Sequence, residues 1–101
     1  MSYFVIGDED TVLGLRYAGV QGAVVDDAQK AREVFNRVCT SKRYNLVLLT
    51  EALAETIRED VNRIRFEVQE PLVVEIPGPE GPSPRRPDLL KLIQEAVGIR
   101  L

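Results

Sequence analysis

Four short apolar runs, separated by stretches of helical periodicity, limit the folds that this chain can adopt. They cover residues 3–6, 22–25, 45–49 and 72–76. Runs of this length are typical of strands that are covered on both faces, as the strands of a parallel sheet are. Strands that alternate with helices are joined by right-handed crossovers, so the sheet lies between layers of helices. The sequence therefore predicts a single α/β domain with a four-stranded parallel sheet in a small three-layer arrangement.

The expected helices have residues suited to begin them and to end them. Asp8 or Asp10 can cap the first helix, near residue 11, and Gly19 ends it where a left-handed residue costs least. The pair Asp26-Asp27 can cap a second helix, which runs to about residue 41. Its apolar residues recur at intervals of three and four: Ala28, Ala31, Val34, Phe35, Val38 and Cys39. One face of this helix is therefore expected to pack on the sheet.

A third helix is predicted to open at Thr50-Glu51. Its apolar stripe is formed by Leu53, Ile57, Val61 and Ile64. Glu59 and Arg63, four residues apart, are expected to pair on its solvated side. In the first helix, Gly14 is a poor helix former, and we expect it where another backbone approaches closely.

The carboxyl ends of the first and third strands are where a fold of this kind places a binding site. The pattern resembles the flavodoxin-like (receiver-like) folds, and by that analogy the strand order is 2-1-3-4. Asp8, Glu9 and Asp10 follow the first strand, and carboxylates are ligands that Mg²⁺ prefers. Capping of the helix start is the simpler interpretation of these residues, and we favour it over a metal site.

Receiver domains of response regulators also carry acidic residues after their first strand. They need a phosphoaccepting aspartate at the end of the third strand, where this chain has Thr50 and then Glu51. They also need a lysine at the end of a fifth strand. No fifth strand is predicted, and none of Lys30, Lys42 and Lys91 is suitably placed. Phosphotransfer is therefore not expected.

Composition excludes several other classes of function. The chain has no histidine, which excludes Ser-His and Cys-His nucleophile pairs and histidine metal sites. The single cysteine, Cys39, has core spacing and is expected to pack as an inert thiol. A net charge of −3 offers no footprint for nucleic acid, and no apolar run is long enough to insert in a membrane. The N-terminus lacks the features of a signal peptide, so we expect a cytoplasmic protein. Because no catalytic or metal-binding constellation is evident, we expect neither a cofactor nor a metal.

The end of the sequence is typical of a connector followed by an amphipathic helix. Four of the six prolines fall in residues 77–84, so an α/β core at 1–76 is expected to be followed by a Pro/Gly-rich, semi-rigid connector at 77–87. Residues 88–101 then form a C-terminal helix, either docked on the sheet or extended toward a partner. The residues expected to bind that partner are Arg85, Arg86, Leu89, Leu92, Ile93 and Ala96.

Several segments, in order and spacing, resemble the F subunit of the prokaryotic V/A-type rotary ATPases over essentially the whole chain. The segments are Val5-Ile6-Gly7-Asp8, Thr11-Val12-Leu13-Gly14-Leu15-Arg16-Tyr17-Ala18-Gly19-Val20, Val47-Leu48-Leu49-Thr50-Glu51, Ala54-Glu55-Thr56-Ile57, Val74-Glu75-Ile76-Pro77-Gly78 and Ala96-Val97-Gly98. None of them is catalytic.

The resemblance implies a non-catalytic subunit of the central rotor stalk, bound to the coiled coil of the D subunit. Such a protein helps to couple ATP hydrolysis or synthesis in the A/B head to proton or sodium transport. In the family the C-terminal helix extends toward the head and modulates ATPase activity, and residues 88–97 match that element. The alternative is a stand-alone receiver-like signalling or adaptor domain that lacks the phosphoacceptor.

Overall fold

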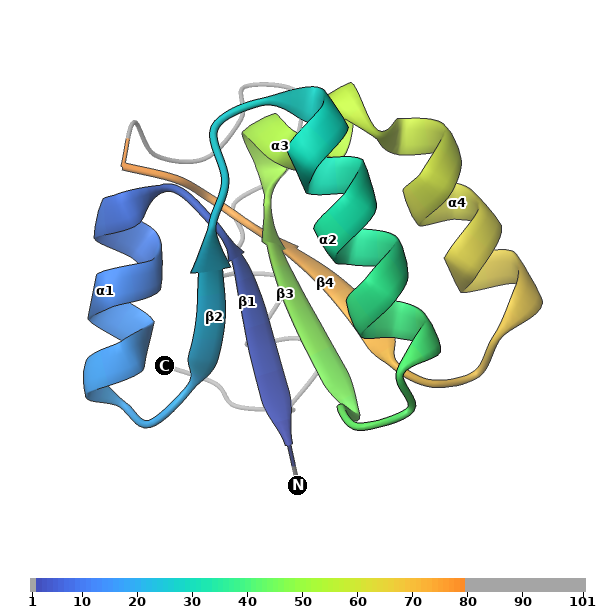
Figure 1. Cartoon of the computed structure of the whole chain (residues 1–101), viewed down its shortest axis with the longest axis horizontal. Coiled ribbons are helices and arrows are strands. Elements are labelled where there is room, and N and C mark those ends of the chain that lie inside the picture. The colour runs from blue at the N-terminus through green and yellow to red at the C-terminus, as the bar shows by residue number, and fades with distance from the viewer. Residues whose placement is uncertain (1, 80–101) are drawn as a thin grey trace, which may run out of the picture.

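The computed structural model describes residues 2–79 of the chain. Its elements in chain order are β1 (Tyr3–Gly7), α1 (Glu9–Tyr17), β2 (Gln21–Val24), α2 (Ala28–Thr40), β3 (Leu46–Thr50), α3 (Glu51–Thr56), α4 (Arg58–Glu67) and β4 (Leu72–Ile76). All pairs of neighbouring strands are parallel, and the order across the sheet is β2-β1-β3-β4 (Figure 1). The predicted α/β class, the flavodoxin-like arrangement and the strand order 2-1-3-4 are confirmed.

The two faces of the sheet are covered unequally. Helices α2, α3 and α4 gather on one face, whereas α1 lies on the other, over β1 and β2 (Figure 1). Alternation along the strands sends side chains to both faces. On the α1 face, Val5 of β1 and Val12 of α1 are both buried between the helix and the sheet. The main core is on the opposite face, and its largest members are Phe35, Ile6, Leu49, Ile57, Val47 and Val61.

Two helices start where local sequence signals predict. The Asp8 side chain accepts a hydrogen bond from the Thr11 backbone N–H at 2.9 Å, and Asp27 does the same for Lys30 at 2.7 Å. Helix α1 begins at Glu9, two residues earlier than expected, because Asp8 rather than Asp10 is its cap. Gly19 has φ +90°, the left-handed conformation that the prediction required.

The predicted third helix is divided into α3 and α4. Its apolar stripe is buried as expected, but the backbone at Ile57 leaves the helical region (φ −125°, ψ 36°). The break separates α3, which contacts β3 as well as α2 and β4, from α4, which contacts α2 and β4. Periodicity alone cannot detect such a break, because the apolar spacing continues through it.

One smaller prediction was wrong, and another is not met within residues 2–79. Arg63 does not pair with Glu59; its guanidinium donates to Asn36 Oδ1 at 2.8 Å and lies 3.9 Å from Asp60. Asn36 is on α2, whereas Asp60 precedes Arg63 by one turn of α4, so Arg63 has one tertiary partner and one partner within its own helix in place of Glu59. Gly14 is not approached by another part of the described chain, since a Cβ there would have no atom within 4 Å.

Candidate functional site

In an open parallel sheet, catalytic and binding sites lie at the carboxyl ends of the strands. A cavity of about 450 Å³ lies there, and its lining includes Asp8, Glu9, Asp26, Thr50 and Leu53. The loops after β1 and β3 therefore meet at one edge, as the parallel topology requires. What this edge can do depends on whether its polar groups are available.

Asp8 is already engaged in holding the start of α1. Besides the backbone bond, its second oxygen accepts a hydrogen bond from the Thr11 hydroxyl at 2.7 Å. Partial burial acts to raise the pKa of Asp8, but the hydrogen bonds from Thr11 outweigh it and hold that pKa below its ordinary value. Within residues 2–79, no three His, Cys, Asp or Glu side chains are grouped so as to hold a metal ion. The capping interpretation of this segment accounts for Asp8.

The position of a receiver phosphoacceptor is filled by groups that do not suit that role. Thr50 ends β3 and is 3% exposed, and Glu51 is buried in the first turn of α3. The described sheet ends at β4, so the strand that would carry a receiver lysine is not among residues 2–79. Among residues 2–79, the acceptor aspartate, lysine and metal ligands that phosphotransfer needs are not assembled at this edge.

Cys39 is placed as expected for a packing residue. It lies on the buried face of α2. Burial raises the pKa of its thiol to about 12, so the nucleophilic thiolate is scarce at neutral pH.

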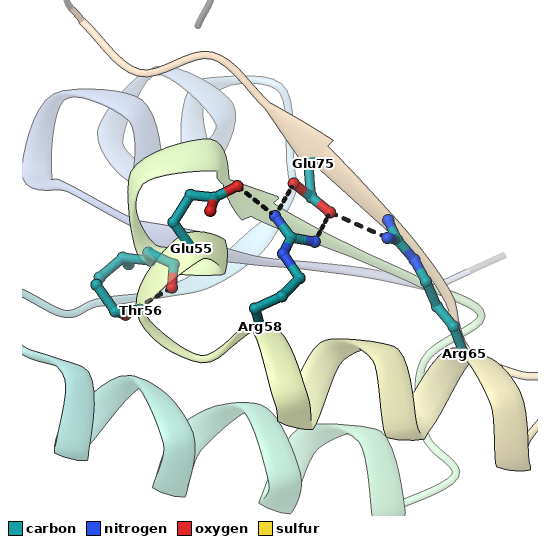
Figure 2. Close-up of polar contacts among 6 residues, drawn as sticks. Glu55, Thr56, Arg58, Arg65 and Glu75 are labelled. Carbon is teal, nitrogen blue, oxygen red and sulfur yellow. Dashed lines mark hydrogen bonds and ion pairs between the residues drawn. The ribbon is translucent and has the colours of Figure 1, made fainter. Parts of the chain in front are cut away.

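A buried carboxylate on β4 organises the main polar cluster of the described fold (Figure 2). The side chain of Glu75 is 3% exposed and accepts two hydrogen bonds from Arg58, at 2.5 and 2.8 Å. Arg65 donates to the same carboxylate at 3.0 Å and to the Val73 carbonyl at 2.9 Å. Arg58 also donates to Glu55 at 2.8 Å. The cluster ties α3 and α4 to the edge strand β4.

This cluster was not predicted from the sequence, although two signals were present. Glu75 is the one charged residue of an apolar strand, and alternation places it on the same face as the buried Val73. Arg58 and Arg65 are seven residues apart, which places them on the same side of a helix. The cluster is a structural device, because its charges are mutually satisfied and it lines no cavity at the carboxyl edge.

Glu75 should make the fold sensitive to acid. Hydrogen bonds from Arg58 outweigh the effect of burial and hold the pKa of Glu75 below its ordinary value of 4.5. Stabilisation by ionised Glu75 is therefore present above pH 4.5 and is lost as the pH falls through the lower, folded-state pKa. We expect Glu75→Gln to lower the unfolding free energy by about 1 kcal/mol at neutral pH and to flatten its fall in acid. Urea titrations at several pH values check this; parallel profiles for wild type and variant would contradict it.

An apolar strip of the sheet lies beyond the reach of α1. On the α1 face, β3 and β4 present the register pairs Leu46–Leu72 and Leu48–Val74, followed by Ile76. Leu72 is 61% exposed and the other four are partly exposed, whereas the opposite face of these strands is buried. We call these five residues the open sheet face. It is a place where an additional apolar helix would fit.

The residues predicted to bind a partner lie outside the described part of the chain. These are Arg85, Arg86, Leu89, Leu92, Ile93 and Ala96, together with most of the connector at 77–87 and the helix at 88–101. Within residues 2–79, no helix has both the length and the apolar character needed to cross a bilayer.

Comparison with known proteins assigns the family. The model of the ATP synthase (F/14-kDa) subunit family matches residues 4–93. The F subunit of the A-type ATP synthase of Methanothermobacter thermautotrophicus is 32% identical over 99 residues, which span 96% of this chain and 92% of that protein. The F subunit of the V-type ATP synthase of Fusobacterium nucleatum is 33% identical over 98 residues, spanning 96% and 91%.

A third relative matches over the full length. The F subunit of the A-type ATP synthase of Methanocaldococcus jannaschii is 28% identical over 102 residues, which span 100% of this chain and 99% of that protein. The resemblance noted in the sequence is thereby confirmed, and the chain belongs to the ATP synthase (F/14-kDa) subunit family, as a subunit of a V/A-type ATP synthase.

Proposed function

We propose that this protein is a non-catalytic subunit of the central rotor stalk of a V/A-type ATPase or ATP synthase. It binds the coiled coil of the D subunit on the cytoplasmic side of the membrane and turns with it. It thereby helps to couple ATP hydrolysis or synthesis in the A/B head to proton or sodium transport. The observation that carries the proposal is the family match over residues 4–93, with relatives named as F subunits that align along nearly all of both chains.

The carboxyl edge of the sheet supports a role without bond chemistry. Asp8 is committed to the cap of α1, and the acceptor position after β3 holds Thr50 and Glu51. These features argue against the alternative of a receiver-like signalling domain, which depends on an acceptor aspartate.

We further propose that the segment after the core regulates the motor. Residues 1–76 form the core domain, 77–87 the connector and 88–101 a helix with two positions. In one position Leu89, Leu92, Ile93 and Ala96 cover the open sheet face. In the other the helix extends to the A/B head, with Arg85 and Arg86 at the rim of its contact. The open sheet face supports the first position, because its partly exposed side chains gain from an apolar cover.

Mixing the purified chain with a homologue of the D subunit tests the proposed function. A rotor protein of this kind should form a stable one-to-one complex, measured as a mass by light scattering during gel filtration. The same sample, incubated with Mg²⁺ and a small phosphodonor, should remain unphosphorylated. Failure to bind the D subunit, together with phosphate incorporation at an aspartate, would favour the receiver-like alternative.

Changing Leu89, Leu92 and Ile93 together to serine should affect regulation more than folding. The triple variant should retain a cooperative thermal transition, because the core at 1–76 has its own buried cluster. In the assembled complex its ATPase rate should differ from that of the wild type. Calorimetry and a coupled ATPase assay measure the two effects. A triple variant that loses folding stability in calorimetry but leaves the ATPase rate of the assembled complex unchanged would contradict the regulatory role.

A further inference from the structure

Helix α1 carries a second apolar stripe that the described fold does not use. Val12 points to the sheet and is 1% exposed. Leu13 and Tyr17, four residues apart, are 44% and 85% exposed. With Asp10 and Gly14 they occupy positions i, i+3, i+4 and i+7, which is one face of a helix. We call these four residues the outer face of α1. A helix with apolar residues on both sides is normally covered on both sides.

Gly14 lowers the stability of α1, and no contact within residues 2–79 requires a glycine there. Glycine in a helix interior is less stable than alanine by about 1 kcal/mol. The cost is often offset where a neighbouring backbone comes close, but here a Cβ would meet no atom within 4 Å. The missing side chain therefore leaves a shallow notch on the outer face, between two large exposed side chains. A notch of this kind lets another helix approach closely.

Charges stand at both ends of this stripe without ion-pair partners inside the described fold. Glu9 and Asp10 are at the start of α1 and Arg16 is in its last turn. None of the three forms an ion pair within residues 2–79. Charges that frame an apolar strip in this way are suited to set the register of a charged partner helix.

The surface continues beyond the end of α1 along the edge strand β2. A hollow of about 500 Å³ lies there, and its lining includes Arg16, Val20 and Gly22. Val24, on the same strand, is 53% exposed. Exposed side chains are therefore also found on β2, the strand that α1 contacts.

We infer that the outer face of α1 is the surface that grips one helix of a coiled-coil partner, an inference that rests on the proposed function. The partner helix lies across Gly14, with its own apolar stripe between Leu13 and Tyr17. Basic residues on it face Glu9 and Asp10, and an acidic residue faces Arg16. Leu13 and Tyr17 are four residues apart, one of the two intervals at which coiled-coil contact positions recur, so the expected occupant is a helix of a coiled coil.

The most exposed aromatic residue elsewhere does not form a comparable surface. Phe66 on α4 is 93% exposed. Its neighbours on the same side of that helix are Glu59, Asn62 and Arg63, all polar. Phe66 is thus an isolated exposed residue on the far side of the sheet from α1, and it provides a matched control.

Gly14→Gln separates an interface role from a structural one. Glutamine is a good helix former and the site is open, so the free chain should gain about 4 °C in melting temperature. In contrast, its affinity for the D subunit should fall about 100-fold, because the side chain fills the notch. Gly14→Ala should raise the melting temperature at least as much, because alanine is the better helix former, but it should weaken binding less, because its methyl group fills less of the notch. Asn62→Ala, an exposed helix substitution on α4, should stabilise the chain without weakening binding.

Tyr17→Ser and Phe66→Ser form the second pair, and all affinities are measured by titration calorimetry with the D subunit. Tyr17→Ser should weaken binding at least about tenfold, and Phe66→Ser should leave it unchanged. Equal affinity of wild type, Gly14→Gln and Tyr17→Ser would overturn the inference while leaving the proposed function intact, as would weakening by Phe66→Ser alone. A wild-type chain that does not bind the D subunit would overturn both.

Discussion

Replacing Arg58 and Arg65 together by methionine is expected to lower the free energy of unfolding by about 4 kcal/mol. The change leaves the carboxylate of Glu75 buried, with a side chain only 3% exposed, and removes both cations that hydrogen bond to it. A buried charge that loses its ion-pair partners is far more costly than a lost surface ion pair. Urea denaturation of the double variant at neutral pH measures the loss.

The loss of stability depends on which partner of the cluster is removed, the carboxylate or the arginines. Glu75→Gln leaves the two guanidinium groups, whose side chains are 32% and 40% exposed and can turn to water. Its cost is therefore about 1 kcal/mol. Adding Glu75→Leu to the double methionine variant should recover most of the lost stability, because a well-packed apolar cluster can replace a buried ionic one. A double variant no less stable than Glu75→Gln would show that the carboxylate is not held by these arginines.

Gly22→Ala is expected to be the most damaging single methyl addition in the described fold, with a cost of about 3 kcal/mol. A Cβ at Gly22 would lie 2.8 Å from the Val5 carbonyl oxygen and 3.1 Å from Val12 Cγ1, and it would also overlap the Val5 side chain. Backbone and packed side chains cannot move aside as a flexible surface residue would. The variant would force α1 away from β2.

Thermal unfolding of Gly22→Ala beside Gly14→Ala checks this, because both add one methyl group to a glycine, the first in β2 and the second in the helix that covers β2. The first should lower the melting temperature by more than about 10 °C, on the scale expected for this size of chain, and the second should raise it. Similar effects from both substitutions would mean that α1 is not packed on β2 as described.

Most of the fold could be predicted from local sequence patterns. The apolar runs, the caps at Asp8 and Asp27 and the left-handed Gly19 are decided within a few residues of sequence, and each was predictable. The break at Ile57 was not, because it depends on how α3 and α4 pack on the sheet and on α2, which lie elsewhere in the sequence. Arg63 shows the same limit, since its partner Asn36 is on another helix.

Of the two candidate binding surfaces, one could be predicted from the sequence and the other could not. The apolar stripe of the C-terminal helix is visible in the sequence, whereas the exposure of Leu13 and Tyr17 is not, because apolar residues at that spacing normally face a core. Gly14 illustrates the point. The sequence predicted that another backbone approaches Gly14 closely, but within residues 2–79 no atom lies within 4 Å of a Cβ built there.

Rotation of this protein in an assembled motor can be observed directly, and it decides whether the protein is part of the rotor. Phe66→Cys places a thiol on an exposed position away from the outer face of α1, while Cys39 is 4% exposed and, with its raised pKa, should not react. A bead can then be attached through Phe66→Cys with a maleimide, and the catalytic head fixed to a surface. Our account predicts that the bead turns continuously in one direction when ATP is added. A bead that stays stationary, while a bead on the D subunit of the same motor turns, would contradict it.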